Sequence, residues 1–209
     1  MADELPILHF ATPPDLEEWL ESNHANAAGL WLTIAKKGAG VESVSYAEAL
    51  ELALCFGWID SQKRGLDERF FLQRFTPRRP RGKWSLINRE KAEGLIAAGA
   101  MRPAGLAEVE AAKADGRWEA AYAPQRAMNA STIPADLRAA IDASARARKT
   151  FGTLNKQNLF SLAFRTNAMK TPEGRAKKIA TLVAMLARGE TIHPNAAPRP
   201  RPRQARRAR

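Results

Sequence analysis

Apolar residues at helical spacing open the chain, and the residues around them mark where the first helix begins. Thr12 is a typical N-cap residue, and Pro13 suits the first position of a helix. Acidic residues follow in the opening turns, where the helix dipole favours negative charge. Leu16, Trp19 and Leu20 then fall on one face, so the pattern predicts an amphipathic helix that begins at Pro13.

A second helix is indicated by a capping box. Ser45 is followed three residues later by Glu48, and the two side chains can satisfy each other's backbone N–H groups. The apolar residues of the stretch ELALCF come next, and Gly57 is a typical helix terminator. We expect this helix to turn its apolar face toward a core.

Three segments have the composition of strands. The stretch GLWLTIAKK at 29–37 alternates apolar residues and is rich in β-branched and aromatic types. The stretches WIDSQKR and ERFFLQRFT flank turn residues 65–67 and predict a β-hairpin. A basic loop, TPRRPRGK, leads from the hairpin toward further helices.

The rest of the chain has helical patterns only. Ser85 predicts a helix to about Ala98, and Pro103 predicts another to about Asp115, although Gly94 and Gly105 weaken them somewhat. The stretch 123–132 lacks periodicity and predicts a domain boundary. Beyond it we expect a helical segment opening at Pro134, a helix around 154–169, and a last helix that starts at Thr171 and Pro172 and ends before Gly189.

These elements predict an α+β fold. The front part, residues 1–122, has N-terminal helices and a small antiparallel sheet or hairpin, and residues 133–194 form a helical domain. Residues 195–209 alternate proline and arginine and have nothing to bury, so we expect a disordered basic tail.

The tail also carries much of the positive charge. The formal net charge is +11, and six arginines lie in the last eleven residues. One interpretation is a nonspecific contact with nucleic acid or an anionic surface, and the other is a solubilising extension. The arginines concerned are Arg199, Arg201, Arg203, Arg206, Arg207 and Arg209.

Several classes of protein are disfavoured by composition. With 45% hydrophobic residues the chain can bury a core, and Cys55 is the single cysteine, so no intramolecular disulfide can form. His9, His24 and His193 have no acidic or cysteine neighbours at ligand spacing, so we expect neither a metal site nor a cofactor. No signal peptide or long apolar run is seen, so we expect a cytoplasmic protein without membrane insertion.

The densest candidate for a binding site lies between residues 56 and 88. Aromatic side chains there alternate with polar and basic ones, and period-two geometry places Trp58, Asp60 and Gln62 on one face of their strand. We expect no catalytic residues, since no catalytic motif is present. The predicted ligand-binding residues are Trp58, Asp60, Gln62, Arg74, Arg78, Arg79, Trp84 and Asn88.

An arginine projecting from a sheet needs a partner, because stripping water from an unpaired guanidinium costs several kcal/mol. In one interpretation Asp60 accepts a bidentate bond from Arg74 or Arg78 and pins the hairpin. In the other, the arginines line a cleft for an anion, with Trp58 or Trp84 as a stacking wall. The basic loop that runs into the helix at Ser85 can be interpreted in two ways, as a solvated basic turn capped by Ser85 or as a second place where an anion binds.

The sequence from Cys55 to Trp118, CFGWIDSQKRGLDERFFLQRFTPRRPRGKWSLINREKAEGLIAAGAMRPAGLAEVEAAKADGRW, resembles the core of the YdeI/OmpD-associated (bacteriocin-protection) family. The resemblance extends upstream through SYAEALELAL and downstream to MLARGETIHP, covering about residues 5–194. It implies a role in bacteriocin protection or in envelope stress involving a porin. The family has no established reaction and supplies no catalytic residues.

Three functions follow from these observations. The first is a noncatalytic cytoplasmic binding protein for an anionic small molecule or a protein, active in bacteriocin or envelope-stress tolerance. The alternative is a nucleic-acid-binding protein that uses the basic loop 74–84 and the arginine tail, with aromatic residues stacking on bases. The third is an enzyme acting on an anion, with Asp60 as acid or base.

Overall fold

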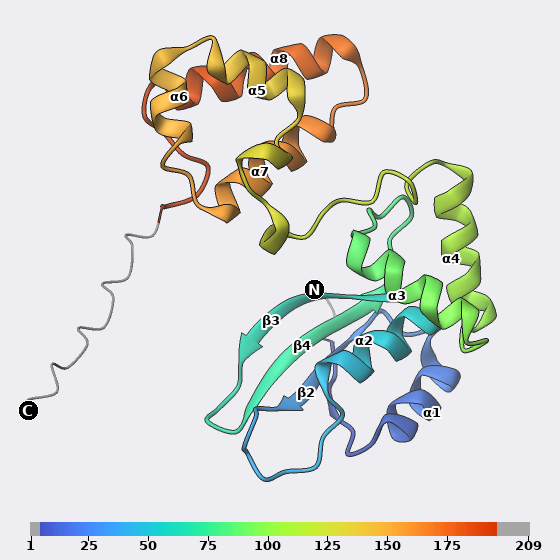
Figure 1. Ribbon diagram of the computed structural model, residues 1–209. Coiled ribbons are helices and arrows are strands. Elements are labelled where there is room, and N and C mark those ends of the chain that lie inside the picture. The colour runs from blue at the N-terminus through green and yellow to red at the C-terminus, as the bar shows by residue number, and fades with distance from the viewer. Residues whose placement is uncertain (1–4, 196–209) are drawn as a thin grey trace, which may run out of the picture. The chain divides into compact units, whose positions relative to one another are not determined.

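The computed structural model describes residues 5–195, and these divide into two compact units between Tyr122 and Ala123 (Figure 1). The described residues form eight α-helices and one four-stranded sheet, so the predicted α+β class is confirmed. The predicted disordered tail lies outside the described residues. None of the described helices is long and apolar enough to cross a membrane.

The first unit, which we call the sheet unit, is built on strands in the order β1-β2-β4-β3. The antiparallel hairpin of β3 and β4 is confirmed, and β4 also pairs antiparallel with β2. The unexpected strand is β1, which pairs parallel with β2 and has only three residues, too few to show a periodicity. The strands are β1 (Ile7–His9), β2 (Leu30–Ala35), β3 (Trp58–Gly65) and β4 (Phe70–Pro77).

Helices α1 (Pro13–Asn23) and α2 (Tyr46–Cys55) cover one face of this sheet (Figure 1). Their starts are confirmed, with Thr12 and Ser45 as N-caps. The Ser45 hydroxyl accepts a hydrogen bond from the N–H of Glu48, whose carboxylate accepts the N–H of Ser45 at 2.8 Å. Buried side chains of both helices and of the sheet form one core, among them Leu16, Leu20, Leu32, Leu50, Leu54, Trp58 and Phe75.

Helices α3 (Leu86–Ala97) and α4 (Pro103–Ala114) complete the sheet unit. Helix α4 approaches the end of α2 closely at Gly105, where an added Cβ would lie 2.3 Å from the carbonyl oxygen of Cys55. From the sequence alone, Gly105 is only a residue that weakens its helix. The structure shows that this glycine is a packing position, because no larger residue fits against the α2 backbone.

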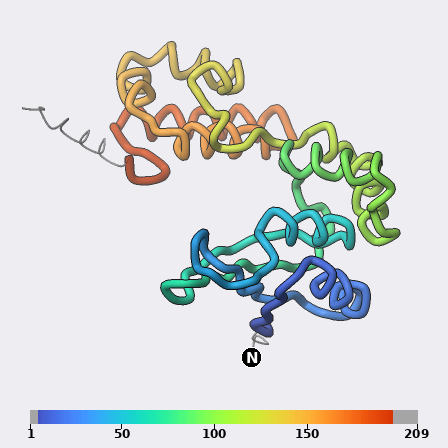
Figure 2. The backbone as a smooth tube through the Cα atoms, turned by 60° about the horizontal axis from the view of Figure 1, so that its bottom comes forward, coloured from blue at the N-terminus to red at the C-terminus, as the bar shows by residue number. Residues whose placement is uncertain are grey.

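The second unit, which we call the helical unit, has α-helices and short 3₁₀ turns and, within residues 123–195, no strand (Figure 2). Its core is formed by buried residues such as Leu137, Ile141, Leu162, Leu182 and Leu186. Helix α6 is not predicted from the sequence, because Ala147 and Phe151 are its only buried residues and the rest are mostly charged. The helices are α5 (Ala135–Asp142), α6 (Ala145–Phe151), α7 (Lys156–Asn167) and α8 (Pro172–Ala187).

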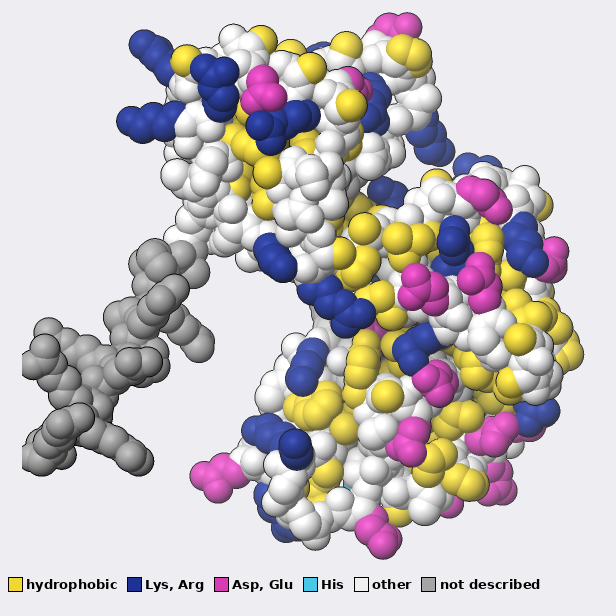
Figure 3. Space-filling view, viewed as in Figure 1, with side chains coloured by type: hydrophobic (Ala, Val, Ile, Leu, Met, Phe, Trp, Pro, Cys, Tyr) yellow, Lys and Arg dark blue, Asp and Glu magenta, His cyan; other side chains and the backbone are white. Residues whose placement is uncertain are grey.

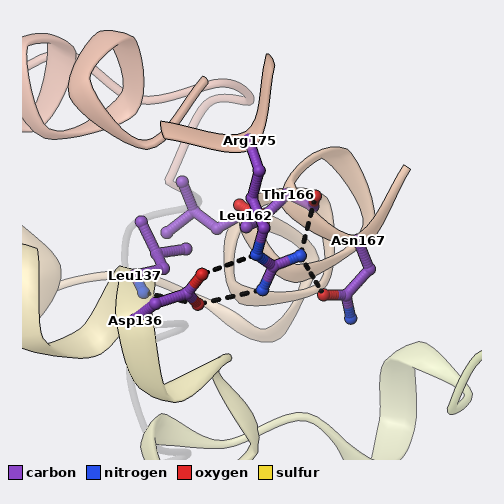
Figure 4. Close-up of polar contacts among 6 residues, drawn as sticks. All are labelled: Asp136, Leu137, Leu162, Thr166, Asn167 and Arg175. Atoms are coloured by element: carbon purple, nitrogen blue, oxygen red, sulfur yellow. Dashed lines mark hydrogen bonds and ion pairs between the residues drawn. The ribbon is translucent and has the colours of Figure 1, made fainter. Parts of the chain in front are cut away.

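One arginine joins three of these helices (Figure 4). The guanidinium of Arg175, in α8, donates to both carboxylate oxygens of Asp136 in α5, at 2.5 and 2.9 Å. Its remaining terminal nitrogen donates to the carbonyl of Thr166 and to the side chain of Asn167, both at 3.1 Å, at the end of α7. Arg175 therefore has partners for all three nitrogens.

The residues after α8 fold back onto α7. The buried amide of Asn158 donates to the carbonyl of His193 and accepts the N–H of the same residue, at 3.0 and 2.9 Å. The His193 ring is hydrogen-bonded to Ser161 at 2.8 Å. His193 therefore has a structural role in holding the residues after α8 against α7, a role that the neighbouring sequence does not predict.

Candidate functional site

A β-bulge lies in the middle of the hairpin. Asp60 pairs with Phe75 and Lys63 pairs with Gln73, so Ser61 and Gln62 together oppose the single residue Arg74. A bulge re-aims the side chains beside it. The expectation that Trp58, Asp60 and Gln62 share one face is therefore wrong for Gln62, because strict alternation ends at the bulge.

An open cavity of about 590 Å³ lies beside this bulge. Its size suits a small organic ligand, since such sites occupy roughly 300–1,000 Å³. Four of its lining residues are basic, and among the described residues none that lines it is acidic. The lining is Ala28, Ile59, Ser61, Gln62, Arg74, Thr76, Pro77, Arg78, Arg79, Gly82 and Lys83.

Arg78 is the most distinctive residue of the cavity. Its side chain is only 8% exposed, and its guanidinium lies 3.5 Å from the centre of the Trp84 ring. Trp84 is itself held by an edge-on contact with Trp118 at 4.8 Å. Arg78 is thus fixed by stacking, and this leaves the edge of its guanidinium for hydrogen bonding.

That edge is not satisfied within the protein. Nε and Nη2 of Arg78 are both buried and have no hydrogen-bond partner among the described residues. Burial lowers the pKa of Arg78 to about 10, while the carboxylates of Glu108 and Asp60 act in the opposite direction. The group therefore keeps its charge at neutral pH, in a place where an unpaired charge is costly.

The other basic groups approach the cavity from β4 and the loop after it. Nε of Arg74 is buried without a partner, whereas Arg79 is exposed. Burial lowers the pKa of Lys83. The loop has a defined shape, because the N–H of Gly82 donates to the carbonyl of Arg79 at 2.8 Å and Arg117 donates to the carbonyl of Gly82 at 2.8 Å.

Of the predicted binding residues, Gln62, Arg74, Arg78 and Arg79 line the cavity together. Trp84 is buried beneath Arg78 and supports it. Sequence reasoning did not name Ser61 as a lining residue, and it considered Thr76 and Lys83 only as part of the basic loop, which it treated as a separate place for an anion. The bulge in β3 and the shape of the loop after β4 bring these side chains together. Neither the bulge nor the shape of the loop is evident from a sequence motif.

The remaining predicted residues lie elsewhere. Trp58 is buried in the core, where its indole N–H donates to the carbonyl of His24 at 3.0 Å. The carboxylate of Asp60 accepts from the hydroxyl of Tyr46 at 2.8 Å, and neither Arg74 nor Arg78 forms an ion pair with it. Asn88 contributes its backbone N–H to the Ser85 cap at 3.2 Å.

A second, smaller cavity of about 220 Å³ also borders Arg78. Trp58 and Glu108 line it, so this cavity offers a carboxylate that the larger one lacks. Arg78 therefore borders two cavities, one whose charged lining residues are all basic and one that also has an acidic lining residue.

Cysteine, histidine and metal chemistry have little support among the described residues. Burial raises the pKa of the Cys55 thiol, the nearby carboxylate of Glu17 adds to this effect, and the side chain lies in the core. His24 is hydrogen-bonded to the carbonyl of Leu20 at 2.8 Å. No group of three or more metal-ligating side chains occurs within residues 5–195.

Comparison with known families divides the chain in the same region as the structure. Residues 8–108 match a domain of unknown function, DUF8412, and residues 130–189 match the family described as Bacteriocin-protection, YdeI or OmpD-Associated. No curated protein and no solved structure matches. Most of the Cys55–Trp118 stretch lies in the DUF8412 match, and only MLARG of the downstream stretch lies in the YdeI/OmpD-associated match. The similarity to the YdeI/OmpD-associated family is therefore found in the helical unit, at residues 130–189.

Proposed function

We propose that the chain is a binding protein rather than an enzyme, and that the cavity of the sheet unit takes an anionic small molecule. The observation that carries this proposal is the buried edge of Arg78, whose Nε and Nη2 lack partners beside an open cavity. A buried donor left unsatisfied costs about 1–3 kcal/mol, and more when it is charged. An anion that enters from the cavity and reaches these buried nitrogens would remove that cost.

The chemistry of the lining narrows the ligand class. A guanidinium edge recognises the two oxygens of a carboxylate or phosphate in a planar, bidentate manner. Arg74, Arg79 and Lys83 add positive charge, and Ser61 and Thr76 add hydroxyl groups. We therefore propose a ligand with one or more phosphate or carboxylate groups and enough bulk to occupy the cavity.

The cellular role follows the family's description. We propose that ligand binding by this chain contributes to bacteriocin or envelope-stress tolerance and that the chain acts in the cytoplasm. Support for the role comes from the YdeI/OmpD-associated domain at residues 130–189. In cells lacking the protein, a copy carrying Arg78→Met should fail to restore survival under bacteriocin, while Arg64→Gln should restore it.

The binding proposal is tested by calorimetric titration of the full chain with pyrophosphate, inorganic phosphate and citrate. Arg78→Met and Arg74→Gln should each weaken binding of the best of these anions by about 10-fold or more, because a hydrogen bond to a charged group is worth about 1.5–3 kcal/mol. The matched control is Arg64→Gln, since Arg64 is exposed, stacks on Trp31 at 4.1 Å and does not line the cavity.

Two results would overturn the proposal. One is wild-type protein that binds none of the three anions. The other is an affinity that Arg78→Met and Arg64→Gln leave equally unchanged, which would place the bound anion outside the cavity. Near-ultraviolet circular dichroism of each variant checks that the sheet unit remains folded.

A further inference from the structure

The positive charge of this protein is not spread evenly over its two units. Residues 1–122 contain 15 lysines and arginines against 18 aspartates and glutamates, a net charge of −3. Residues 123–195 contain 12 against 4, a net charge of +8. The basic character of the chain therefore belongs to the helical unit as well as to the tail, and the cavity lies in the unit that is acidic overall.

The few carboxylates of the helical unit are largely used within it. Asp136 pairs with Arg175 at 2.5 Å, Asp142 pairs with Arg138 at 2.8 Å, and Glu190 pairs with Arg188 at 2.8 Å. Nine cationic side chains remain without a carboxylate partner among the described residues. They are Arg126, Arg146, Arg148, Lys149, Lys156, Arg165, Lys170, Lys177 and Lys178, all exposed except the half-buried Lys178.

These cations are most concentrated on α6. Arg146, Arg148 and Lys149 lie within four residues, while Ala147 and Phe151 anchor the helix in the core. Arg148 also donates to the carbonyl of Asp142 at 3.0 Å, which leaves its charge uncompensated by a carboxylate. Figure 3 shows Lys and Arg side chains spread across one face of the helical unit, with few Asp or Glu side chains between them.

The nine positive charges repel one another, so binding a polyanion would relieve this repulsion. Two features separate the possible polyanions. The large hydrophobic side chains that are exposed all belong to the sheet unit, so the described helical unit has no apolar anchor of the kind that inserts into a lipid surface. Its phenylalanines are buried or half-buried, so exposed rings for stacking on unpaired bases are lacking in residues 123–195.

We propose that the helical unit binds the phosphate backbone of double-stranded nucleic acid without regard to sequence, using α6 as a principal contact. Contacts between cationic side chains and phosphates release counterions, so affinity should fall steeply with salt. This proposal is independent of the anion cavity, because none of the nine cations lines it.

The test is fluorescence anisotropy with a labelled DNA duplex of mixed sequence, over a series of salt concentrations. All proteins are full-length and carry glutamine in place of the six tail arginines, so that the tail does not contribute. One variant adds Arg146→Gln, Arg148→Gln and Lys149→Gln. The matched control adds Lys37→Gln, Lys63→Gln and Arg69→Gln, which removes the same charge from exposed positions of the sheet unit.

We expect the tail-substituted protein to bind the duplex. The α6 variant should bind at least about 10-fold more weakly at low salt, and the slope of log K against log salt should be shallower by about 2–3, since each phosphate contact contributes about 0.9. The control should behave like its parent. Far-ultraviolet circular dichroism confirms that α6 substitution leaves the helices intact.

Three outcomes would overturn the proposal. The tail-substituted protein could fail to bind the duplex. The control could lose as much affinity as the α6 variant, which would show that the loss depends on the net charge of the protein and not on α6. Finally, the protein could bind vesicles containing phosphatidylserine while leaving the duplex free, which would assign the surface to lipid headgroups.

Discussion

Arg175 in the helical unit and Arg78 in the sheet unit differ in whether their guanidinium nitrogens have hydrogen-bond partners within the chain. Arg175 donates from all three nitrogens to Asp136, Thr166 and Asn167. Arg78 is more deeply buried, yet two of its nitrogens have no partner and a cavity lies beside it. Arg175 is satisfied by its own chain, whereas the unsatisfied nitrogens of Arg78 need an explanation, and the proposed anion supplies one.

The same contrast holds for the two units as wholes. The sheet unit is acidic overall, and four of its basic side chains line one cavity. The helical unit is strongly basic and displays most of its cations on the outside. Net charge is therefore the basis for the polyanion surface proposed in the helical unit, and unsatisfied hydrogen-bond donors are the basis for the small-anion site proposed in the sheet unit.

The largest effect on stability is expected from Gly105→Ala in the sheet unit. The new Cβ would lie 2.3 Å from the carbonyl oxygen of Cys55 and 2.6 Å from that of Leu54, so helices α2 and α4 would have to separate. We expect a loss of about 3 kcal/mol in the free energy of unfolding, at the upper end of overpacking effects. The matched control is Gly94→Ala in α3, which meets nothing within 4 Å and should gain about 0.5–1 kcal/mol.

Tryptophan fluorescence during urea unfolding measures both changes, because all five tryptophans belong to residues 1–122. The signal therefore reports on the sheet unit alone. Equal stability of the two alanine variants would show that α4 does not need the close approach at Gly105.

A smaller effect is expected from Arg175→Met in the helical unit. The change removes the link between α5, α7 and α8 and leaves Asp136 without its ion pair (Figure 4). Since both side chains are partly exposed, we expect a loss of about 1–2 kcal/mol. Far-ultraviolet circular dichroism should register the loss while tryptophan fluorescence stays as in the wild type. Arg165→Met, on the exposed side of α7, should change neither signal.

Local signals predict much of this fold. The caps at Thr12, Ser45, Ser85 and Thr171 and the hairpin turn are each encoded within a few residues, and all form as expected. Helix α6 is different, because it has only two buried residues and is held by its neighbours. Strand β1 depends likewise on pairing with β2, a contact between distant parts of the sequence.

The candidate site was predictable in some of its residues but not in its geometry. The arginines at 74, 78 and 79 are evident from the sequence, and they do line one cavity. In one of the two interpretations Asp60 was the partner of Arg74 or Arg78, but its carboxylate accepts a hydrogen bond from Tyr46 instead. The bulge at Ser61 and Gln62 is a property of strand register, and a single strand's alternation carries no information about it.

The most direct test of the account compares the thermal unfolding of wild type and Arg78→Met, with and without the anion that binds best. Without anion, the variant should be more stable than wild type by about 1 kcal/mol, because burying an unpaired charge costs several kcal/mol and stacking on Trp84 returns about 2 kcal/mol. With anion, wild type should gain stability and the variant should not. A variant that is less stable without anion, and that gains as much as wild type with it, would contradict the account.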